Sequence, residues 1–498
     1  MLYKNYIGGE WVDAKGGGTF QSVNPATGAV LGDVALSGPE DVNAAAEAAA
    51  SAFDAWRKTP APKRGEILFR AGEILVRRKE ELARLMTQEM GKVLKETRGD
   101  VQEAIDMTYY MAGEGRRLFG QTTPSELPNK FAMSLRDPIG VVAAITPWNF
   151  PLAIPTWKIM PALIAGNTVV FKPASDTPIL AWQLASILEE AGLPPGALNV
   201  VFGPGGQAGQ ALVESLKVAL VSFTGSTAVG RELGATASAR GKRVSLEMGG
   251  KNAILVMADA DLELAVEGII WSAFGTTGQR CTAASRVIAQ RGIAEELTQM
   301  IVARAEKLRL GDGLRADTDM GPLINEAARR KVHAYVQVGQ QEGARLRAGG
   351  ETAETGELRR GFFYKPTVFA EVRPEARLAQ EEIFGPVVAV IPVDNLQEAI
   401  AVNNATGYGL SSSLYTRDVN QAFQAIRDIT TGLVYINAGT IGAEVHLPFG
   451  GTRGTGNGHR EAGQSALDIF SEWKTVFVDY SGRLQRAQID VEEQKSQP

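Results

Sequence analysis

The feature that most constrains the fold is a regular alternation of apolar strand-like runs and helical runs over residues 141–239. The alternating runs span 141–145, 155–165, 168–171, 178–191, 198–202, 206–216, 219–223 and 227–239. Alternation of this kind favours right-handed crossovers between parallel strands. We therefore predict an α/β fold with a doubly wound parallel sheet, an architecture that binds nucleotides beyond the carboxyl ends of its strands.

The rest of the chain divides into parts with different patterns. Three helical runs precede the alternating unit, over 39–55, 63–91 and 93–118. A second α/β segment follows it, over 250–450. Residues 119–137 are polar and limited by prolines, which fits either a solvated loop or a protruding hairpin that pairs with another subunit. A last strand is predicted at 474–480, and the charged tail beyond Gln485 is expected to fray.

Cys281 is the only cysteine in the chain, so neither an internal disulfide nor a thiolate-rich metal site can form. A lone cysteine is more often a small buried hydrophobic residue than a nucleophile. Its neighbours here are glycines and small polar residues, which suit an exposed backbone turn. A helix end and Arg280 are expected to lower the pKa of the thiol and favour the reactive thiolate. We therefore treat Cys281 as a candidate nucleophile.

Two further side chains are candidates for the same chemistry. Glu247 ends an apolar run and precedes two glycines; a carboxyl in such a crevice has a raised pKa and can act as a base near neutral pH. An exposed loop glutamate is the alternative. Asn149 follows the first strand between aromatic residues, where its N–H can donate to an oxyanion. Capping of the next helix is the competing interpretation of Asn149.

Three residues at strand ends are candidates for holding a nucleotide. Gly225 and Ser226 form a tight turn between a strand and a helix, where free N–H groups favour a phosphate. Their G-x-x-x-x-G spacing differs from the dinucleotide fingerprint, so a purely structural turn is equally compatible. Lys172 ends another strand and can reach ribose hydroxyls or phosphates, although a single lysine is more commonly a surface residue.

Composition narrows the class of protein. Lys and Arg number 51 against 56 Asp and Glu, a net charge of −5, which gives no basic footprint for nucleic acid or a membrane surface. No apolar run has transmembrane length, and the start lacks the apolar core of a signal peptide. We expect a protein of the reducing cytoplasm. The three histidines, His333, His446 and His459, are dispersed and indicate no metal site.

Taken together, these motifs resemble those of the aldehyde dehydrogenase superfamily over essentially the whole chain. Each matching stretch is weak alone, but their joint order and spacing are specific: 147–151, 171–175, 223–230, 246–252, 278–282, 381–386 and 448–451. The resemblance implies a cofactor domain over 1–119 plus 138–249, a catalytic domain over 250–450, and an oligomerisation arm from 120–137 plus 470–485. It also implies a homodimer or homotetramer.

The resemblance assigns a role to each candidate residue. Cys281 would attack a small-molecule aldehyde, with Asn149 and the backbone N–H of Cys281 holding the oxyanion. Hydride would pass to a nicotinamide, and Glu247 would activate the water that hydrolyses the resulting thioester. The implied cofactor contacts are Trp148, Lys172, Ser175, Gly225, Ser226, Glu382 and Phe384.

Ser175 is a departure that bears on the choice of cofactor. Many strictly NAD-dependent relatives carry glutamate at this position, where the carboxylate binds the adenosine ribose and repels a 2′-phosphate. Serine removes that repulsion and can donate a hydrogen bond. We therefore expect NADP to be accepted, alongside NAD.

The substrate is less well defined by the sequence. By resemblance, the substrate tunnel would be lined or approached by Ile154, Trp157, Thr277, Arg280 and Phe449. Arg280 occurs in relatives that act on negatively charged aldehydes, although a structural arginine that bonds loop carbonyls is the favoured alternative. Trp157 stands where succinate-semialdehyde enzymes place an arginine. The segments 456–461 and 480–485 are similar to relatives that act on amino-acid-derived semialdehydes.

Other functions remain compatible with these residues. A nonphosphorylating glyceraldehyde-3-phosphate dehydrogenase, a CoA-acylating relative or a thioester hydrolase would use the same scaffold. Glu247 favours hydrolysis, because acylating relatives tend to lack that base. A non-enzymatic role is disfavoured by the presence of Cys281, Glu247 and Asn149.

Overall fold

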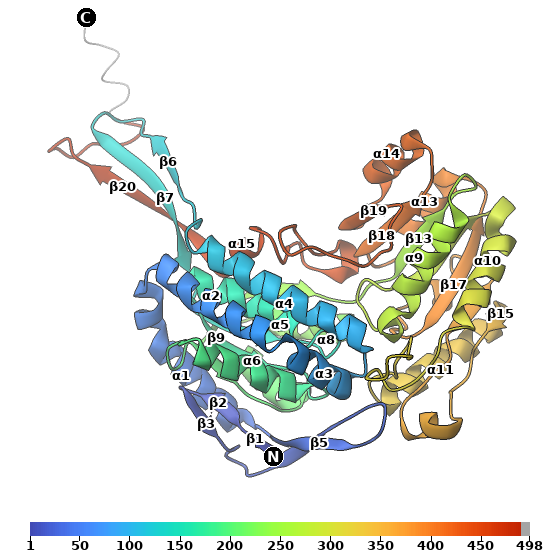
Figure 1. Cartoon of the computed structure of the whole chain (residues 1–498). Helices are drawn as coiled ribbons and strands as arrows, with labels where there is room; N and C mark the ends of the chain where they lie inside the picture. The colour runs from blue at the N-terminus through green and yellow to red at the C-terminus, as the bar shows by residue number, and fades with distance from the viewer. Residues whose placement is uncertain (490–498) are drawn as a thin grey trace, which may run out of the picture.

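The first α/β body contains a seven-stranded sheet whose strand order reverses in its middle. The computed structural model describes residues 1–489, and in it this body lies beside a second one, with an arm projecting from one corner (Figure 1). In spatial order the strands are β12 (Arg243–Glu247), β11 (Val218–Thr224), β8 (Val141–Ile145), β9 (Thr168–Lys172), β10 (Leu198–Val200), β2 (Asn5–Ile7) and β3 (Glu10–Val12). Strands β8 to β12 are mutually parallel. Because the chain leaves β8 in one direction and later returns to its other side as β11, a topological switch point lies between these two strands.

Helices cover both faces of this sheet because its central strands, such as β8, are buried on both sides. In β8, Val142 and Ala144 pack into one core and Val141, Ala143 and Ile145 into the other. The helices of this body are α1 (Pro39–Lys58), α2 (Ala61–Arg77), α3 (Lys79–Met90), α4 (Leu94–Glu114), α5 (Ala153–Ala165), α6 (Pro178–Glu190), α7 (Gln210–Glu214) and α8 (Thr227–Ser238). A short π-helix, Gly205–Gly209, leads into α7.

The second body repeats the same plan. Its strands are β15 (Arg345–Ala348), β16 (Thr367–Ala370), β17 (Val387–Val393), β14 (Ala284–Gln290), β13 (Asn252–Val256), β18 (Ser411–Tyr415) and β19 (Leu433–Ile436), all parallel except β15. Its helices are α9 (Leu262–Phe274), α10 (Arg291–Ala305), α11 (Glu326–Gln341), α12 (Arg377–Gln380), α13 (Leu396–Asn404) and α14 (Val419–Asp428). The predictions of a doubly wound parallel sheet and of a second α/β unit are therefore confirmed, and the second sheet is also mainly parallel.

The arm is a three-stranded antiparallel sheet. β6 (Gln121–Pro124) and β7 (Lys130–Pro138) form a hairpin, and β20 (Ser471–Asp479) pairs with β7 along its whole length. Of the two interpretations of 119–137, the protruding hairpin is confirmed and the solvated loop is wrong. The helix α15 (Ala466–Phe470) leads into β20, and a small sheet of β1 (Leu2–Tyr3), β5 (Val30–Ala35) and β4 (Thr19–Val23) lies near the start of the chain.

The helical run expected over 63–91 is in fact two helices. α2 ends before Arg78, whose φ of −98° and ψ of 9° depart from helical values, and α3 begins after it. The single amphipathic pattern concealed the break because apolar positions continue on both sides of Arg78. The tail expected to fray lies outside the described residues from 490 onward.

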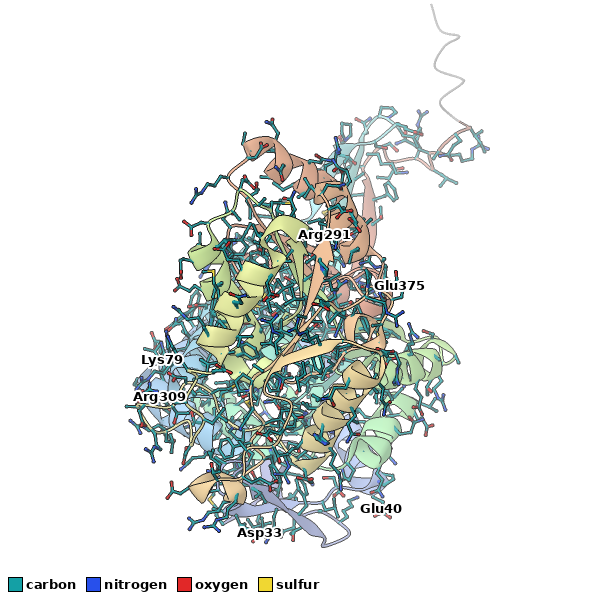
Figure 2. The ribbon with its side chains drawn as sticks, turned by 90° about the vertical axis from the view of Figure 1, so that its right-hand side faces the viewer. Asp33, Glu40, Lys79, Arg291, Arg309 and Glu375 are labelled. Atoms are coloured by element: carbon teal, nitrogen blue, oxygen red, sulfur yellow. The ribbon has the colours of Figure 1, made fainter. Side chains whose placement is uncertain are left out.

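The outer surface of the two bodies is charged. Figure 2 shows Asp33, Glu40 and Arg291 among the labelled side chains at the periphery, where all three are exposed. Among residues 1–489, no helix combines the length and the apolar character needed to cross a membrane.

Candidate active site

Two cavities between the bodies meet at Cys281. The first, of about 230 Å³, opens at the switch point of the first sheet, and we call it the switch-point cavity. The second, of about 100 Å³, lies behind it, and we call it the inner cavity. Both are lined in part by the same four residues, Ile154, Thr224, Met248 and Cys281. Cys281 therefore faces two separate spaces that two different molecules could occupy.

Most of the residues selected from the sequence line one of these cavities. Those in the switch-point cavity are Trp148, Asn149, Ile154, Gly225, Ser226, Cys281, Glu382 and Phe384. Those in the inner cavity are Ile154, Trp157, Glu247, Arg280, Cys281 and Phe449. Lys172, Ser175 and Thr277 lie outside both linings, and the Thr277 hydroxyl instead donates to the carbonyl of Gly321 at 3.0 Å.

The switch-point cavity is built from strand ends. Trp148 and Asn149 follow β8, and Gly225 and Ser226 follow β11, so the two loops diverge on either side of the switch point. Ser226 is the N-cap of α8, and its hydroxyl accepts from the backbone N–H of Val229 at 3.4 Å. The other free N–H groups of this helix start carry partial positive charge, which suits a phosphate.

The loop that carries Cys281 is held in an uncommon conformation. Thr276, Thr277 and Gly278 have φ values of 53°, 58° and 68°, the left-handed region that non-glycine residues seldom adopt. A side chain at Gly278 would collide with the carbonyl of Gly385. The Asn252 side chain fixes the far side of the loop by donating to the carbonyl of Cys281 at 2.7 Å.

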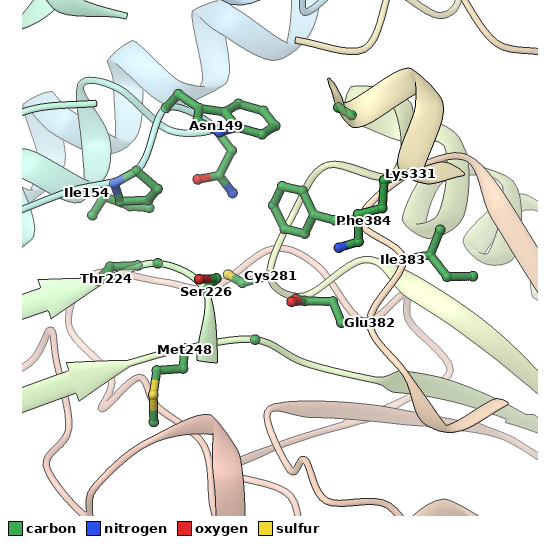
Figure 3. Close-up of a pocket in the computed structure, with 15 residues that line it drawn as sticks. Asn149, Ile154, Thr224, Ser226, Met248, Cys281, Lys331, Glu382, Ile383 and Phe384 are labelled. Atoms are coloured by element: carbon green, nitrogen blue, oxygen red, sulfur yellow. The ribbon is translucent and has the colours of Figure 1, made fainter. Parts of the chain in front are cut away.

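The Asn149 amide faces the same space as the sulfur (Figure 3). Its Nδ2 donates one hydrogen bond to the carbonyl of Gln279 at 3.1 Å, which orients the group and leaves its second N–H free to donate. The helix α5 has Leu152 at its N-cap and no side-chain cap. The interpretation of Asn149 as a helix cap is therefore wrong.

The expected effect on the thiol is wrong as well. Burial, together with the smaller effect of the Glu247, Glu382 and Glu103 carboxyls, raises the pKa of Cys281 to about 12. The Arg280 guanidinium forms an ion pair with Glu96, and the pKa of the thiol stays raised although the charges of Arg280 and Cys281 interact. The sequence around the cysteine contains Arg280 but none of these carboxyls. Reasoning from the neighbouring residues therefore predicted a lowered thiol pKa where the structure shows a raised one.

Glu247 is a buried carboxyl, as the glycine-lined strand end suggested. Burial is the main reason that its pKa lies well above the usual range, and the nearby Glu461 carboxyl adds to this, while Lys158 and Arg460 oppose it. Lys158 forms an ion pair with Glu461 and also donates to the hydroxyl of Ser222 at 3.2 Å. This environment favours the protonated form of the Glu247 carboxyl.

Sequence reasoning missed Lys158 and Glu461. A lysine within the otherwise apolar α5 was an available signal, because a lysine is rarely fully buried without a partner. Glu461 belongs to the segment 456–461, which had been noted only for its similarity to certain relatives. Their pairing spans 303 residues of sequence, so only the fold reveals it.

Glu382 and Phe384 complete the switch-point cavity on the side of the second body. One Glu382 carboxyl oxygen accepts from the backbone N–H of Gly250 at 3.0 Å, and burial raises the pKa of this carboxyl. A side chain at Gly249 would displace the Glu382 carboxyl from this position, so glycine leaves the room that the carboxyl occupies. The rings of Trp148 and Phe384 meet edge to face at 5.5 Å.

Lys172 and Ser175 lie farther along the same edge of the sheet, after β9. Lys172 is buried and donates to the carbonyl of Pro173 at 2.7 Å; burial lowers the pKa of its ammonium to about 8. The Ser175 hydroxyl donates to the carbonyl of Gly203 at 3.0 Å. The side chain at position 175 carries no charge.

The inner cavity is lined by three aromatic side chains, three carboxyls and one cation: Phe150, Trp157, Phe449, Glu103, Glu247, Glu461 and Arg280. Trp157 and Phe449 meet edge to face at 4.9 Å. Arg280 lies with its guanidinium carbon 5.3 Å from the centre of the Phe150 ring. Its Nε donates to the hydroxyl of Thr276 at 3.0 Å in addition to the Glu96 pair. The partners of Arg280 are therefore side chains and not the expected loop carbonyls, but Glu96 and Thr276 do hold it in a structural role, and it also lines the cavity.

Metal ligation has no support in the described part of the chain. Over residues 1–489, no group of three or more His, Cys, Asp and Glu side chains is placed to hold a metal ion.

Known proteins resemble the chain over almost its entire length. A model of the aldehyde dehydrogenase family matches residues 11–476. The alpha-ketoglutaric semialdehyde dehydrogenase of Bacillus subtilis (strain 168) is 44% identical over 477 residues, which cover 96% of this chain and 98% of that protein. The alpha-ketoglutarate semialdehyde dehydrogenase of Haloferax volcanii is 44% identical over 479 residues, covering 96% and 99%. A crystal structure of Staphylococcus aureus betaine aldehyde dehydrogenase in complex with NAD+ superposes with a TM-score of 0.95 at 34% identity, covering 97% of this chain and 95% of that one.

Proposed function

The chain belongs to the aldehyde dehydrogenase family, and from that premise we propose that it oxidises alpha-ketoglutaric semialdehyde to the dicarboxylic acid with NAD+ or NADP+. As a member of that family it is an oxidoreductase that acts on aldehydes. The observation that carries the proposal is the position of Cys281 between a cavity at a nucleotide-binding switch point and an inner cavity that contains Arg280. The relatives at 44% identity support the choice of an acidic semialdehyde.

The residues of the switch-point cavity fit a dinucleotide. The start of α8 offers backbone N–H groups to a phosphate, and Glu382 keeps one carboxyl oxygen free of the Gly250 hydrogen bond to accept from a ribose hydroxyl. Gly249 leaves the room that this carboxyl needs. When bound, NAD(P)+ supplies the hydride acceptor. We assign its contacts to Trp148, Lys172, Ser175, Gly225, Ser226, Glu382 and Phe384.

The chemistry follows from three side chains. Cys281 reacts as the thiolate after its proton passes to water; the sulfur forms a bond to the aldehyde carbon, and the electron pair of the carbonyl moves to its oxygen. The free N–H of Asn149 and the backbone N–H of Cys281 donate to that oxyanion. Loss of hydride from the carbon leaves a thioester on Cys281. Glu247 then takes a proton from water, the resulting hydroxide attacks the thioester, and the carboxylic acid leaves as the thiolate is restored.

A substrate panel tests the proposed function. We expect kcat/KM for alpha-ketoglutaric semialdehyde to exceed that for pentanal, an uncharged aldehyde of the same chain length, by roughly 10- to 100-fold, since a charge-assisted contact would be lost. The measurement is NAD(P)H absorbance, with glyceraldehyde 3-phosphate as a second anionic substrate and with CoA present or absent. A preference for glyceraldehyde 3-phosphate, or a requirement for CoA, would replace the proposal with one of those alternative activities.

Ser175 allows a test of the cofactor assignment. We expect the wild-type enzyme to use NADP+ as well as NAD+, and Ser175→Glu to lower kcat/KM for NADP+ by roughly 10- to 100-fold while sparing NAD+, because the new carboxylate repels the 2′-phosphate. Ser175→Gln is the matched control, with a similar size and no charge. A wild-type preference for NAD+ of about a thousandfold or more would contradict the assignment, since it would mean that the 2′-phosphate is rejected although Ser175 carries no charge.

The arm supports a homodimer or homotetramer. β20 is an edge strand, and its outward side chains include Trp473 and Phe477, which are 55% and 61% exposed. Apolar rings on an unpaired strand are typical of a surface that another chain covers. We propose that the strands of 120–137 and 470–485 form this contact. We also propose that 1–119 with 138–249 bind the cofactor, that 250–450 carry the nucleophile, and that the enzyme acts in the cytoplasm, where its thiol would stay reduced.

A further inference from the structure

Glu103 is a carboxyl in the inner cavity that the mechanism above does not use. It lies on α4 and lines this cavity together with Arg280 and Cys281. Within residues 1–489, its carboxyl accepts no hydrogen bond and forms no ion pair, although it is deep enough for burial to dominate its titration. A buried carboxyl without a partner is costly unless something else binds it or it takes up a proton.

The charged neighbours of Glu103 are already paired with one another. The Lys92 ammonium forms an ion pair with Asp100 at 2.8 Å, and both side chains are fully buried. The second carboxyl oxygen of Asp100 accepts from the backbone N–H of Ala153 at 2.9 Å. Arg280 is held by Glu96. The cations Lys92 and Arg280 are thus each paired with another carboxylate. Glu103 is left without a cation partner and is available to a molecule in the inner cavity.

This environment favours the neutral form of Glu103. Burial and the Asp100 and Asp106 carboxylates raise its pKa to about 8, against the opposing charge of Lys92. The other titratable groups that line the inner cavity are Glu247, Arg280, Cys281 and Glu461. At neutral pH the carboxyl is therefore mainly protonated and can donate one hydrogen bond. Above its pKa it becomes an anion that repels another anion.

We propose that Glu103 is a specificity-determining residue that donates a hydrogen bond to the carboxylate tail of the semialdehyde, beside the charge of Arg280. The inference rests on the proposed function, because it requires a substrate with an anionic tail. With the aldehyde carbon at Cys281, the tail extends into the part of the inner cavity that Glu103, Phe150 and Arg280 line. A protonated acid beside a cation accepts a carboxylate there, whereas an ionised one excludes it.

Two substitutions of Glu103 distinguish the effect of its hydrogen bond from the effect of its side-chain volume. We expect Glu103→Leu to lower kcat/KM for alpha-ketoglutaric semialdehyde by roughly 10- to 100-fold, through KM, and to leave pentanal oxidation nearly unchanged. Glu103→Gln keeps an N–H donor, so its kcat/KM for alpha-ketoglutaric semialdehyde should stay within a few-fold of the wild-type value at neutral pH. Pentanal turnover by both variants serves as the control for correct folding.

The pH dependence gives a readout that a merely structural role would not produce. The quantity to measure is the ratio of kcat/KM for the semialdehyde to that for pentanal, because the titrations of Cys281 and Glu247 cancel in it. In wild type this ratio should fall from neutral to alkaline pH as Glu103 ionises. In Glu103→Gln it should stay flat.

Several outcomes would overturn the inference. One is a ratio that does not change with pH in wild type, or that Glu103→Leu leaves unaltered. Another is faster semialdehyde oxidation by Glu103→Leu, which would show that Glu103 is ionised and repels the tail. A preference of wild type for 4-aminobutanal that Glu103→Leu removes would assign a cationic tail instead. A wild-type enzyme with no preference for the semialdehyde over pentanal would defeat the proposed function itself.

Discussion

Replacing Cys281 with serine is expected to abolish aldehyde oxidation while cofactor binding survives. The sulfur lies where the two cavities meet, and a serine hydroxyl at that position ionises far less readily than a thiol. Without the covalent bond to the aldehyde carbon, neither hydride loss nor a thioester can follow. Removal of a nucleophile in comparable enzymes lowers kcat by roughly 10⁴- to 10⁶-fold. Steady-state NAD(P)H formation measures the loss.

Cofactor binding is the control for this variant. The Cys281 side chain forms only part of the switch-point cavity, whose other lining residues are unchanged, so calorimetric titration with NAD+ or NADP+ should give an affinity close to that of wild type. Because the chain has a single cysteine, alkylation of wild type by iodoacetamide should remove activity in proportion to the thiol modified. Turnover retained by Cys281→Ser or by the alkylated protein would reject the assignment of the nucleophile.

Glu247→Gln is expected to separate the two halves of the reaction. In the proposed mechanism, hydride transfer needs Cys281 and Asn149, whereas hydrolysis needs a base near the thioester, and Glu247 lines the inner cavity together with Cys281. The variant should therefore release about one equivalent of NAD(P)H in a rapid burst and then turn over slowly, with steady-state kcat reduced by about 10²- to 10⁴-fold. Stopped-flow absorbance resolves the two phases.

The pH dependence of hydrolysis has a defined sign. Burial and Glu461 raise the pKa of Glu247, and only its ionised form can take a proton from water, so thioester hydrolysis in wild type should accelerate as pH rises through that pKa. Glu247→Gln should lose this dependence. Glu444→Gln is the matched control, since the Glu444 side chain is 68% exposed and should leave both phases intact. A Glu247→Gln variant with wild-type kcat and no burst would remove Glu247 from the role of base.

The sequence predicted those features of the fold and the site that follow directly from the order of strands and helices along the chain. Apolar runs separated by helices predicted the parallel sheets, and parallel strands place their carboxyl ends on one edge. Asn149, Gly225 and Ser226 therefore meet although the chain separates them. The raised pKa of Glu247 was also predicted, because an apolar strand followed by glycines already indicates burial.

Other features depend on groups that are distant in sequence. The Cys281 pKa was predicted with the wrong sign, because three carboxyls from other segments surround the sulfur. The pairing of Lys158 with Glu461 has no local signature. Glu103 looks like an ordinary glutamate on an amphipathic helix, and only the packing of α4 against α5 turns it inward to the cavity.

The most direct test of the account is the mass of the Cys281 peptide after Glu247→Gln enzyme is mixed with alpha-ketoglutaric semialdehyde and NAD(P)+ and then quenched in acid. We predict that this peptide carries the acyl group of the substrate, in an amount equal to the NAD(P)H released. An unmodified Cys281 peptide alongside NAD(P)H release, or an acyl group on another residue, would contradict the claim that this sulfur joins the two cavities in one reaction.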